Sequence, residues 1–131
     1  MIAVDTNVLA RLLLRDDEAQ YRKVVKLFGD GRDYTAPVTV MLELVWVLES
    51  YERTRAEIVM ALTALLGLPN FKPKQKAALL TALSGYEAGL DFGDAFHLAL
   101  SSADEAFATF DKSLNKLSRR VGLKTTPVEL L

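Results

Sequence analysis

The chain of 131 residues has no cysteine and only one histidine, His97. The absence of cysteine excludes disulfides, thiolate metal sites and a cysteine nucleophile. It also suits a reducing compartment. With no cysteine and no histidine cluster, any metal ion would have to be held by oxygen ligands.

Long apolar runs are missing as well. Arg11, Glu43 and Glu49 interrupt the longest of them, so no segment is long enough to span a bilayer. The first residues carry no basic region, and Asp5 falls where a signal peptide would be apolar. We therefore expect a cytoplasmic protein without a membrane segment.

The chain has no excess of either charge. Sixteen Lys and Arg face seventeen Asp and Glu, for a net charge of −1. This balance neither indicates nor excludes nucleic acid as a partner. Any phosphate-binding surface would have to be a local patch or depend on bound cations.

The chain has the composition of a globular protein, 50% hydrophobic and 25% charged. Its length is typical of one domain, which we expect to span residues 1–131. Short apolar strands alternate with amphipathic helices, and a brief extended piece is expected at 70–72. The strands are predicted at 2–4, 34–36, 106–110 and 123–125. The helices are predicted from Thr6 or Asn7 onward and at 18–28, 39–51, 56–66, 74–88, 94–101 and 113–120. Asp16 and Asp17 are expected as the N-cap and first-turn acid of the helix at 18–28, and Thr39 as the cap of the helix at 39–51. This order predicts an α/β fold with a parallel sheet covered by helices on both faces.

Four acids fall at predicted strand ends and helix starts: Asp5, Glu43, Asp94 and Asp111. The carboxyl ends of parallel strands and the starts of the following helices share one edge of such a sheet, so these acids can converge there. Four carboxylates in one pocket repel each other unless a cation neutralises them. Oxygen ligands favour Mg²⁺ or Mn²⁺ over zinc, and such a site suits in-line hydrolysis of a phosphodiester.

Each acid also has a purely structural interpretation. Asp5 and Asp111 could cap helices, and Glu43, expected in the first turn of its helix, could be a residue favoured by the helix dipole. The sequence D-F-G-D favours Asp91 as the cap of the helix that Asp94 opens. His97 lies one helical turn after Asp94, and a packed helix residue is favoured there over a proton shuttle.

The ordered set of motifs resembles a known family. These motifs are M-I-A-V-D-T-N-V-L at the start, then E-L-V-W-V-L, D-F-G-D-A-F-H-L-A and A-T-F-D-K. The set, which covers essentially the whole chain, is similar to PIN domains and most closely to VapC-type toxins of prokaryotic toxin–antitoxin pairs. The resemblance implies a three-layer α/β/α fold with a central parallel sheet of four to five strands. It also implies RNA cleavage by a metal-activated water, with Mg²⁺ or Mn²⁺.

Site residues follow from the resemblance by motif. It implies that the metal-binding acids are Asp5, Glu43, Asp94 and Asp111, and that flanking polar residues are Thr6, Asn7 and Thr109. Asp91 is still expected to cap its helix, and a role in the outer shell of the metal site stays open. The resemblance further implies a homodimer and inhibition by a cognate antitoxin protein. The apolar helix at 56–66 is rich enough to pack against a partner as well as the core.

Basic residues gather in three places: Arg11 and Arg15; Lys72, Lys74 and Lys76; and Lys112, Lys116, Arg119 and Arg120. The first and last groups follow the two strands that end in Asp. They could hold an RNA backbone, or they could be solvated helix faces.

Three alternatives stay open from the sequence. The chain could be a PIN nuclease outside any toxin pair. It could be a receiver-type signalling domain, although that fold needs paired acids after its first strand. It could also be a metal-free binding module whose acids are only caps.

Overall fold

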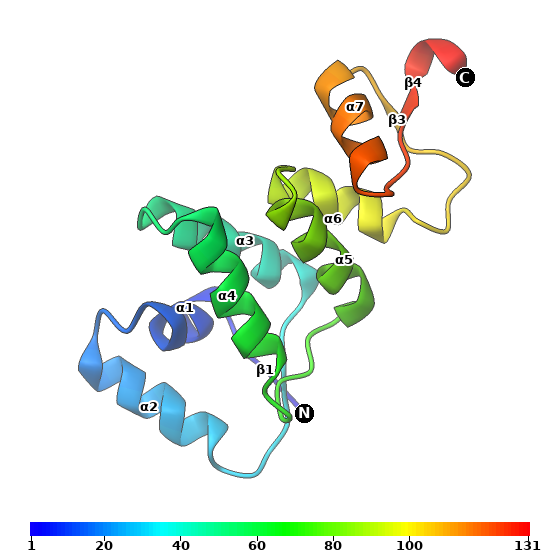
Figure 1. Ribbon diagram of the computed structural model, residues 1–131. Helices are drawn as coiled ribbons and strands as arrows, with labels where there is room; N and C mark the ends of the chain where they lie inside the picture. The colour runs from blue at the N-terminus through cyan, green and yellow to red at the C-terminus, as the bar shows by residue number, and fades with distance from the viewer. The chain divides into compact units, whose positions relative to one another are not determined.

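The computed structural model describes all 131 residues and divides them into two compact units. The N-terminal unit is Met1–Lys74 and the C-terminal unit is Gln75–Leu131. Helices dominate both units (Figure 1). Every strand is only two residues long. No helix combines the length and the apolar character needed to cross a bilayer.

The N-terminal unit pairs its strands in parallel and packs helices around them. Its elements are β1 (Ile2–Ala3), α1 (Thr6–Leu14), α2 (Glu18–Phe28), β2 (Tyr34–Thr35), α3 (Val38–Ser50) and α4 (Arg55–Leu66). In the parallel β1–β2 pair, Ile2 lies opposite Tyr34 and Ala3 opposite Thr35. Phe71 adds a parallel bridge on the other side of Tyr34, as expected for the extended piece at 70–72.

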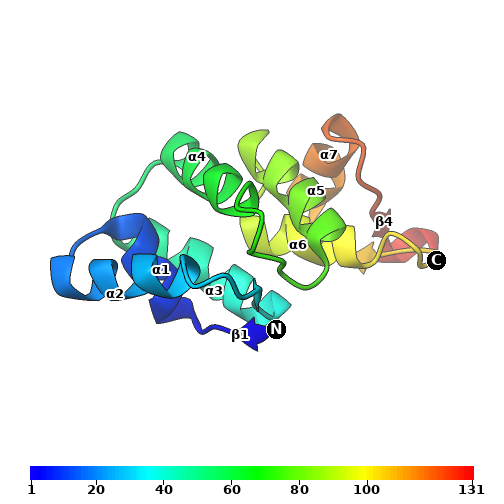
Figure 2. The ribbon, with the colours of Figure 1, turned by 90° about the horizontal axis from the view of Figure 1, so that it is seen from below.

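Helix α1 packs against both α2 and α3, and α3 also packs against α4. The fully buried side chains Leu9, Leu44 and Leu62 come from α1, α3 and α4. Their helices bury these residues because apolar positions recur at a helical spacing on one face. The first turn of α1 is thereby held beside α3, and both helices are seen in Figure 2.

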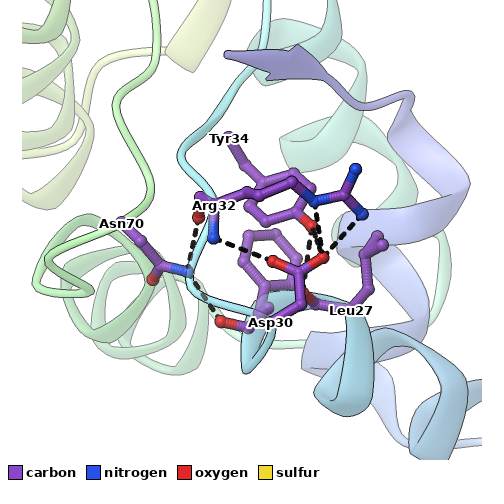
Figure 3. A network of polar contacts seen from close by, with 6 residues as sticks. Leu27, Asp30, Arg32, Tyr34 and Asn70 are labelled. Atoms are coloured by element: carbon purple, nitrogen blue, oxygen red, sulfur yellow. Dashed lines mark hydrogen bonds and ion pairs between the residues drawn. The ribbon is translucent and has the colours of Figure 1, made fainter.

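A polar network closes the amino end of β2 (Figure 3). Asp30 Oδ2 accepts hydrogen bonds from Arg32 Nη2 at 2.6 Å and from the Tyr34 hydroxyl at 2.5 Å. Leu27 O lies 3.0 Å from the same Tyr34 hydroxyl oxygen, so two acceptors compete for its single proton. Asn70 Nδ2 donates to Phe28 O at 2.6 Å and ties the network to the Phe71 segment. Arg32 and Tyr34 lower the pKa of Asp30 to about 2.

The C-terminal unit contains α5 (Lys76–Glu87), α6 (Phe92–Leu100), β3 (Ala108–Thr109), α7 (Lys112–Arg120), β4 (Thr126–Pro127) and a short 3-10 helix, η1 (Val128–Leu130). Strands β3 and β4 pair in parallel, with Ala108 opposite Thr126. Helices α5 and α6 pack closely because Gly85 has no side chain. A Cβ at Gly85 would lie 3.1 Å from the Cβ of Ala95.

The α/β class, with parallel strand pairs between helices, is confirmed. The strands form two pairs, one in each unit, with Phe71 as a third position beside β2.

Several predicted boundaries need correction. Thr39 does not cap α3, since the carbonyl oxygen of Pro37 accepts the first helical hydrogen bonds and no side chain caps this helix. Glu43 therefore falls in the second turn and not the first. The α6 helix begins at Phe92, two residues before Asp94.

The third strand is shorter than expected, and the last strand lies at 126–127 and not at 123–125. The N–H of Leu123 donates to Ser118 O at 3.0 Å. Residue 123 therefore completes the carboxyl end of α7, which Gly122 terminates with a φ of +74°. The chain becomes available for strand pairing only after that turn.

Candidate functional site

Asp5 stands at the junction between the first strand and α1. Its Oδ1 accepts a hydrogen bond from the N–H of Val8 at 3.1 Å, and so it is the N-cap of α1. The cap uses one carboxylate oxygen only, and the side chain is exposed. The structural role of Asp5 therefore leaves Oδ2 available to a ligand.

Glu43 is brought to the same place by helix packing. Thr6 Oγ1 donates to Glu43 Oε2 at 2.9 Å, across 37 positions of sequence. Because α3 packs on α1, the second predicted acid reaches the residue that follows the first. Thr6, which follows Asp5 in the chain, thus links the D-T-N motif to Glu43 within the N-terminal unit.

Asn7 and Asp5 line a cavity of about 320 Å³ together with Val8, Arg11, Gln20 and Lys23. Arg11 lies in an ion pair with Asp16 at 2.8 Å, and Arg15 pairs with Glu18 at the same distance. The basic group of Arg11 and Arg15 is therefore engaged within the unit.

Asp94 is the half-buried member of the set. Burial raises its pKa most, and the neighbouring charges of Asp91 and Asp111 raise it further, whereas His97 opposes them. Asp91 Oδ2 accepts a hydrogen bond from the N–H of Asp94 at 3.0 Å, which confirms Asp91 as the cap of α6. Asp94 thus lies where negative charge accumulates.

Asp111 is the N-cap of α7. Its Oδ1 accepts hydrogen bonds from Leu114 N at 3.0 Å and from Ser113 Oγ at 2.7 Å, which lower its pKa. Thr109 Oγ1 accepts from the N–H of Asp111 at 3.0 Å. Thr109 therefore positions the backbone that carries this acid.

Each unit thus contains two of the four predicted acids. In the N-terminal unit Thr6, the neighbour of Asp5 in the chain, donates to Glu43. In the C-terminal unit the charge of Asp111 acts on Asp94 and raises its pKa. Neither unit by itself gathers three side chains of the metal-binding types.

The sequence was also compared with protein families and with curated proteins. A sequence model of the PIN domain matches residues 2–120. The chain belongs to the PIN-domain family. None of the curated proteins in the comparison matches the chain.

The PIN-domain match spans both units and includes all four acids. PIN domains are generally metal-dependent nucleases, which are hydrolases. This chain therefore has a nuclease-type fold. The match also removes the receiver-domain alternative.

The residues of this PIN domain fit a hard divalent cation. All four side chains are carboxylates, the ligands that Mg²⁺ and Mn²⁺ favour. Oδ2 of Asp5, Oε1 of Glu43 and Oδ2 of Asp111 accept no hydrogen bond. No ion pair neutralises any of the four acids. Burial and the charges of Asp91 and Asp111 raise the pKa of Asp94, so a bound cation would favour its ionised form.

His97 is exposed on α6, and its effect on Asp94 is electrostatic.

Two supporting residues of this PIN domain were not predicted from the sequence. Ser113 donates to the Asp111 carboxylate, and Asn115 Nδ2 donates to the Asp111 carbonyl oxygen at 3.1 Å. Asn115 and Ser118 are buried polar residues on α7. Polar residues on the inward face of a short amphipathic helix were the signal that could have identified Asn115.

Proposed function

We propose that the protein is a metal-dependent endoribonuclease and the toxin of a VapBC-type toxin–antitoxin pair. Asp5, Glu43, Asp94 and Asp111 hold Mg²⁺ or Mn²⁺, and residues 1–131 act as one PIN domain. One observation carries the proposal. All four acids keep at least one carboxylate oxygen without a hydrogen-bond or ion-pair partner, in a chain of a family of metal-dependent nucleases.

The residues of this chain have distinct tasks in RNA hydrolysis. A bound divalent cation supplies charge neutralisation at the scissile phosphate and activates water. Thr6 fixes Glu43 by its hydrogen bond, and Thr109 fixes the backbone of Asp111. Asp94 has the raised pKa, so it must lose its proton before it can act as a ligand. Activity should therefore fall toward acid pH.

The partner proteins belong to the same proposal. A homodimer and a cognate antitoxin need exposed apolar surface, and Met60 on α4 is 74% exposed while Trp46 on α3 is 51% exposed. The resemblance to VapC-type toxins supports a cytoplasmic role in RNA cleavage. A PIN nuclease without an antitoxin remains the alternative, and growth arrest that a neighbouring antitoxin gene relieves separates the two.

The decisive test is the substitution Asp5→Asn. Asparagine still caps a helix but carries no charge, so α1 should be retained. RNA cleavage in Mg²⁺ should fall on the order of 10²–10³-fold, the loss typical of removing one preorganised electrostatic group. The measurements are RNA-end sequencing after brief expression and cleavage assays with purified protein.

Asp17→Asn provides the matched control. Asp17 caps α2 in the same way, through a 3.0 Å hydrogen bond from Gln20 N. Asp17→Asn should leave RNA cleavage unchanged, because helix capping is the role that the structure gives Asp17. Cleavage at the wild-type level by Asp5→Asn would overturn the proposed site, and equal losses in both variants would assign the effect to helix capping.

A further inference from the structure

A pocket of about 540 Å³ opens on the C-terminal unit around the start of α7. The side chains that matter in it are Phe110, Lys112, Asn115, Lys116, Arg119 and Glu129. Its size is in the range of small-ligand sites. Phe110 and Lys112 flank Asp111 in the chain, so the pocket adjoins a residue of the proposed nuclease site.

Phe110 presents an aromatic ring to solvent from a rigid position. Its residue surface is 76% exposed. The backbone around it is fixed, because Asp111 N donates to Thr109 Oγ1 and Asp111 O accepts from Asn115 Nδ2. An exposed phenylalanine forgoes the favourable free energy of burial. A ring held outward by a fixed loop is suited to stack on a planar ligand.

The cations of the pocket lie on one face of α7. Lys112, Lys116 and Arg119 follow each other at four and three residues, the spacing of neighbours on a helix. All three are free of ion pairs. Glu129 is the single acid among the lining residues, so the pocket favours a negatively charged ligand.

Partly buried hydrogen bonds hold Asn115, one of the residues that line the pocket. Thr125 Oγ1 donates to Asn115 Oδ1 at 2.5 Å, and Ser118 Oγ lies 3.1 Å from Thr125 Oγ1. These bonds tie α7 to the segment that leads into β4. Asn115 is therefore a positioning residue, since it holds the start of α7 through the Asp111 carbonyl oxygen and the segment before β4 through Thr125.

From these observations we infer that the pocket holds one nucleotide of single-stranded RNA next to Asp111. The base stacks on Phe110, and Lys112, Lys116 and Arg119 contact backbone phosphates. Cationic grooves combined with exposed aromatic rings are the recognition mode of single-stranded nucleic acids. An acidic protein segment would satisfy the cations and leave the ring without a planar partner. The inference rests on the proposed function, since it assigns a substrate subsite to that nuclease.

Binding without cleavage tests the pocket. The probe is a fluorescein-labelled single-stranded RNA of mixed sequence, about 12 nucleotides long, titrated by anisotropy in EDTA at several salt concentrations. Phe110→Ala should weaken binding about tenfold or more, as expected for the loss of one stacked base, and Phe110→Trp should bind like wild type. Lys116→Ala and Arg119→Ala should each reduce the slope of log K against log salt by about 0.7.

Arg120→Ala is the matched control for charge. Arg120 is exposed on α7 beside Arg119 but does not line the pocket. Its substitution should change the affinity and the slope less than Arg119→Ala does. Equal effects of the two would reduce the pocket to a general basic surface and overturn the inference. Circular dichroism should show that each variant is folded.

The outcomes separate this inference from the proposed function. If wild type binds and cleaves RNA while Phe110→Ala binds equally well, only the pocket assignment fails. If wild type neither binds RNA nor cleaves it in Mg²⁺, the nuclease proposal fails as well. If the pocket variants keep RNA binding and lose binding of a poly-glutamate peptide, the pocket serves a protein partner and the inference is overturned.

Discussion

At the amino end of β2, Asp30 accepts hydrogen bonds from a guanidinium, a phenol and a backbone N–H. At the carboxyl end of β1, Asp5 accepts one backbone N–H, and Glu43 accepts one neutral hydroxyl. Both ends belong to the same parallel pair. The acid at the amino end is neutralised within the fold, whereas those at the carboxyl end are left with free oxygens.

This difference separates structural acids from candidate functional ones. An acid whose oxygens are all paired stabilises the fold and has little capacity left for a ligand. Uncompensated acids that lie close together raise each other's pKa or require a cation. The comparison therefore predicts that substitutions at the two ends have opposite effects, on stability at one end and on activity at the other.

After Asp5→Asn, the largest effect is expected from Thr6→Val, which removes the hydroxyl and keeps the shape of the side chain. Glu43 then loses the hydrogen bond that orients it. RNA cleavage should fall roughly 10–100-fold, the usual cost of losing a partner that orients a metal ligand. Thr6→Ser is the control and should keep most of the activity. Unchanged cleavage by Thr6→Val would show that the link between Thr6 and Glu43 is only structural.

A smaller and opposite effect is expected from Asp30→Asn at the amino end. The ion pair with Arg32 is lost and the bond from Tyr34 is weakened. The melting temperature at neutral pH should fall by a few degrees, and RNA cleavage should stay at the wild-type level. Asp5→Asn should give the reverse pattern, with cleavage lost and the melting temperature kept.

The pH dependence sharpens this prediction. The pKa of Asp30 is lowered to about 2 in the folded protein, below its ordinary value near 4. Its stabilising effect is therefore complete above about pH 4 and is lost as the pH falls toward 2. The melting temperatures of wild type and Asp30→Asn should converge over that window. A constant difference down to pH 2 would contradict this origin of the stability.

The sequence predicted some of these features and not others, for local and non-local reasons. Helix α2 was predicted at its observed ends, 18–28, because apolar periodicity and the two acids before it, Asp16 and Asp17, are local signals. Asp17 is the observed cap. The cap at Thr39 was wrong because Pro37 supplies the carbonyl that starts α3. The bond between Thr6 and Glu43 joins residues 37 positions apart and exists only through the packing of α1 on α3.

The candidate site was reached in a similar way. Strand-end position pointed to Asp5 and Asp111, and expected helix-start position pointed to Glu43 and Asp94. The motif resemblance then implied all four as metal ligands. Strand pattern alone could not predict that Asn115 and Ser113 hold Asp111, since both bonds depend on how α7 begins. The use of each carboxylate oxygen is a property of the folded chain.

The smallest effect extends the comparison to the C-terminal unit. Asp91→Asn keeps the cap of α6 and removes one of the charges that raise the pKa of Asp94. The pKa of Asp94, followed by carboxyl NMR titration in EDTA, should decrease. It should remain above the ordinary aspartate value, because burial is the larger cause and Asp111 is still present.

The raised pKa of Asp94 also links its titration to stability. Ionised Asp94 opposes folding, and this cost is relieved as the pH falls through the raised pKa. The variant should therefore lose less stability than wild type when Asp94 ionises. An unchanged titration of Asp94 would show that Asp91 is fully screened, and Asp111 would then be the only neighbouring carboxylate that acts on it.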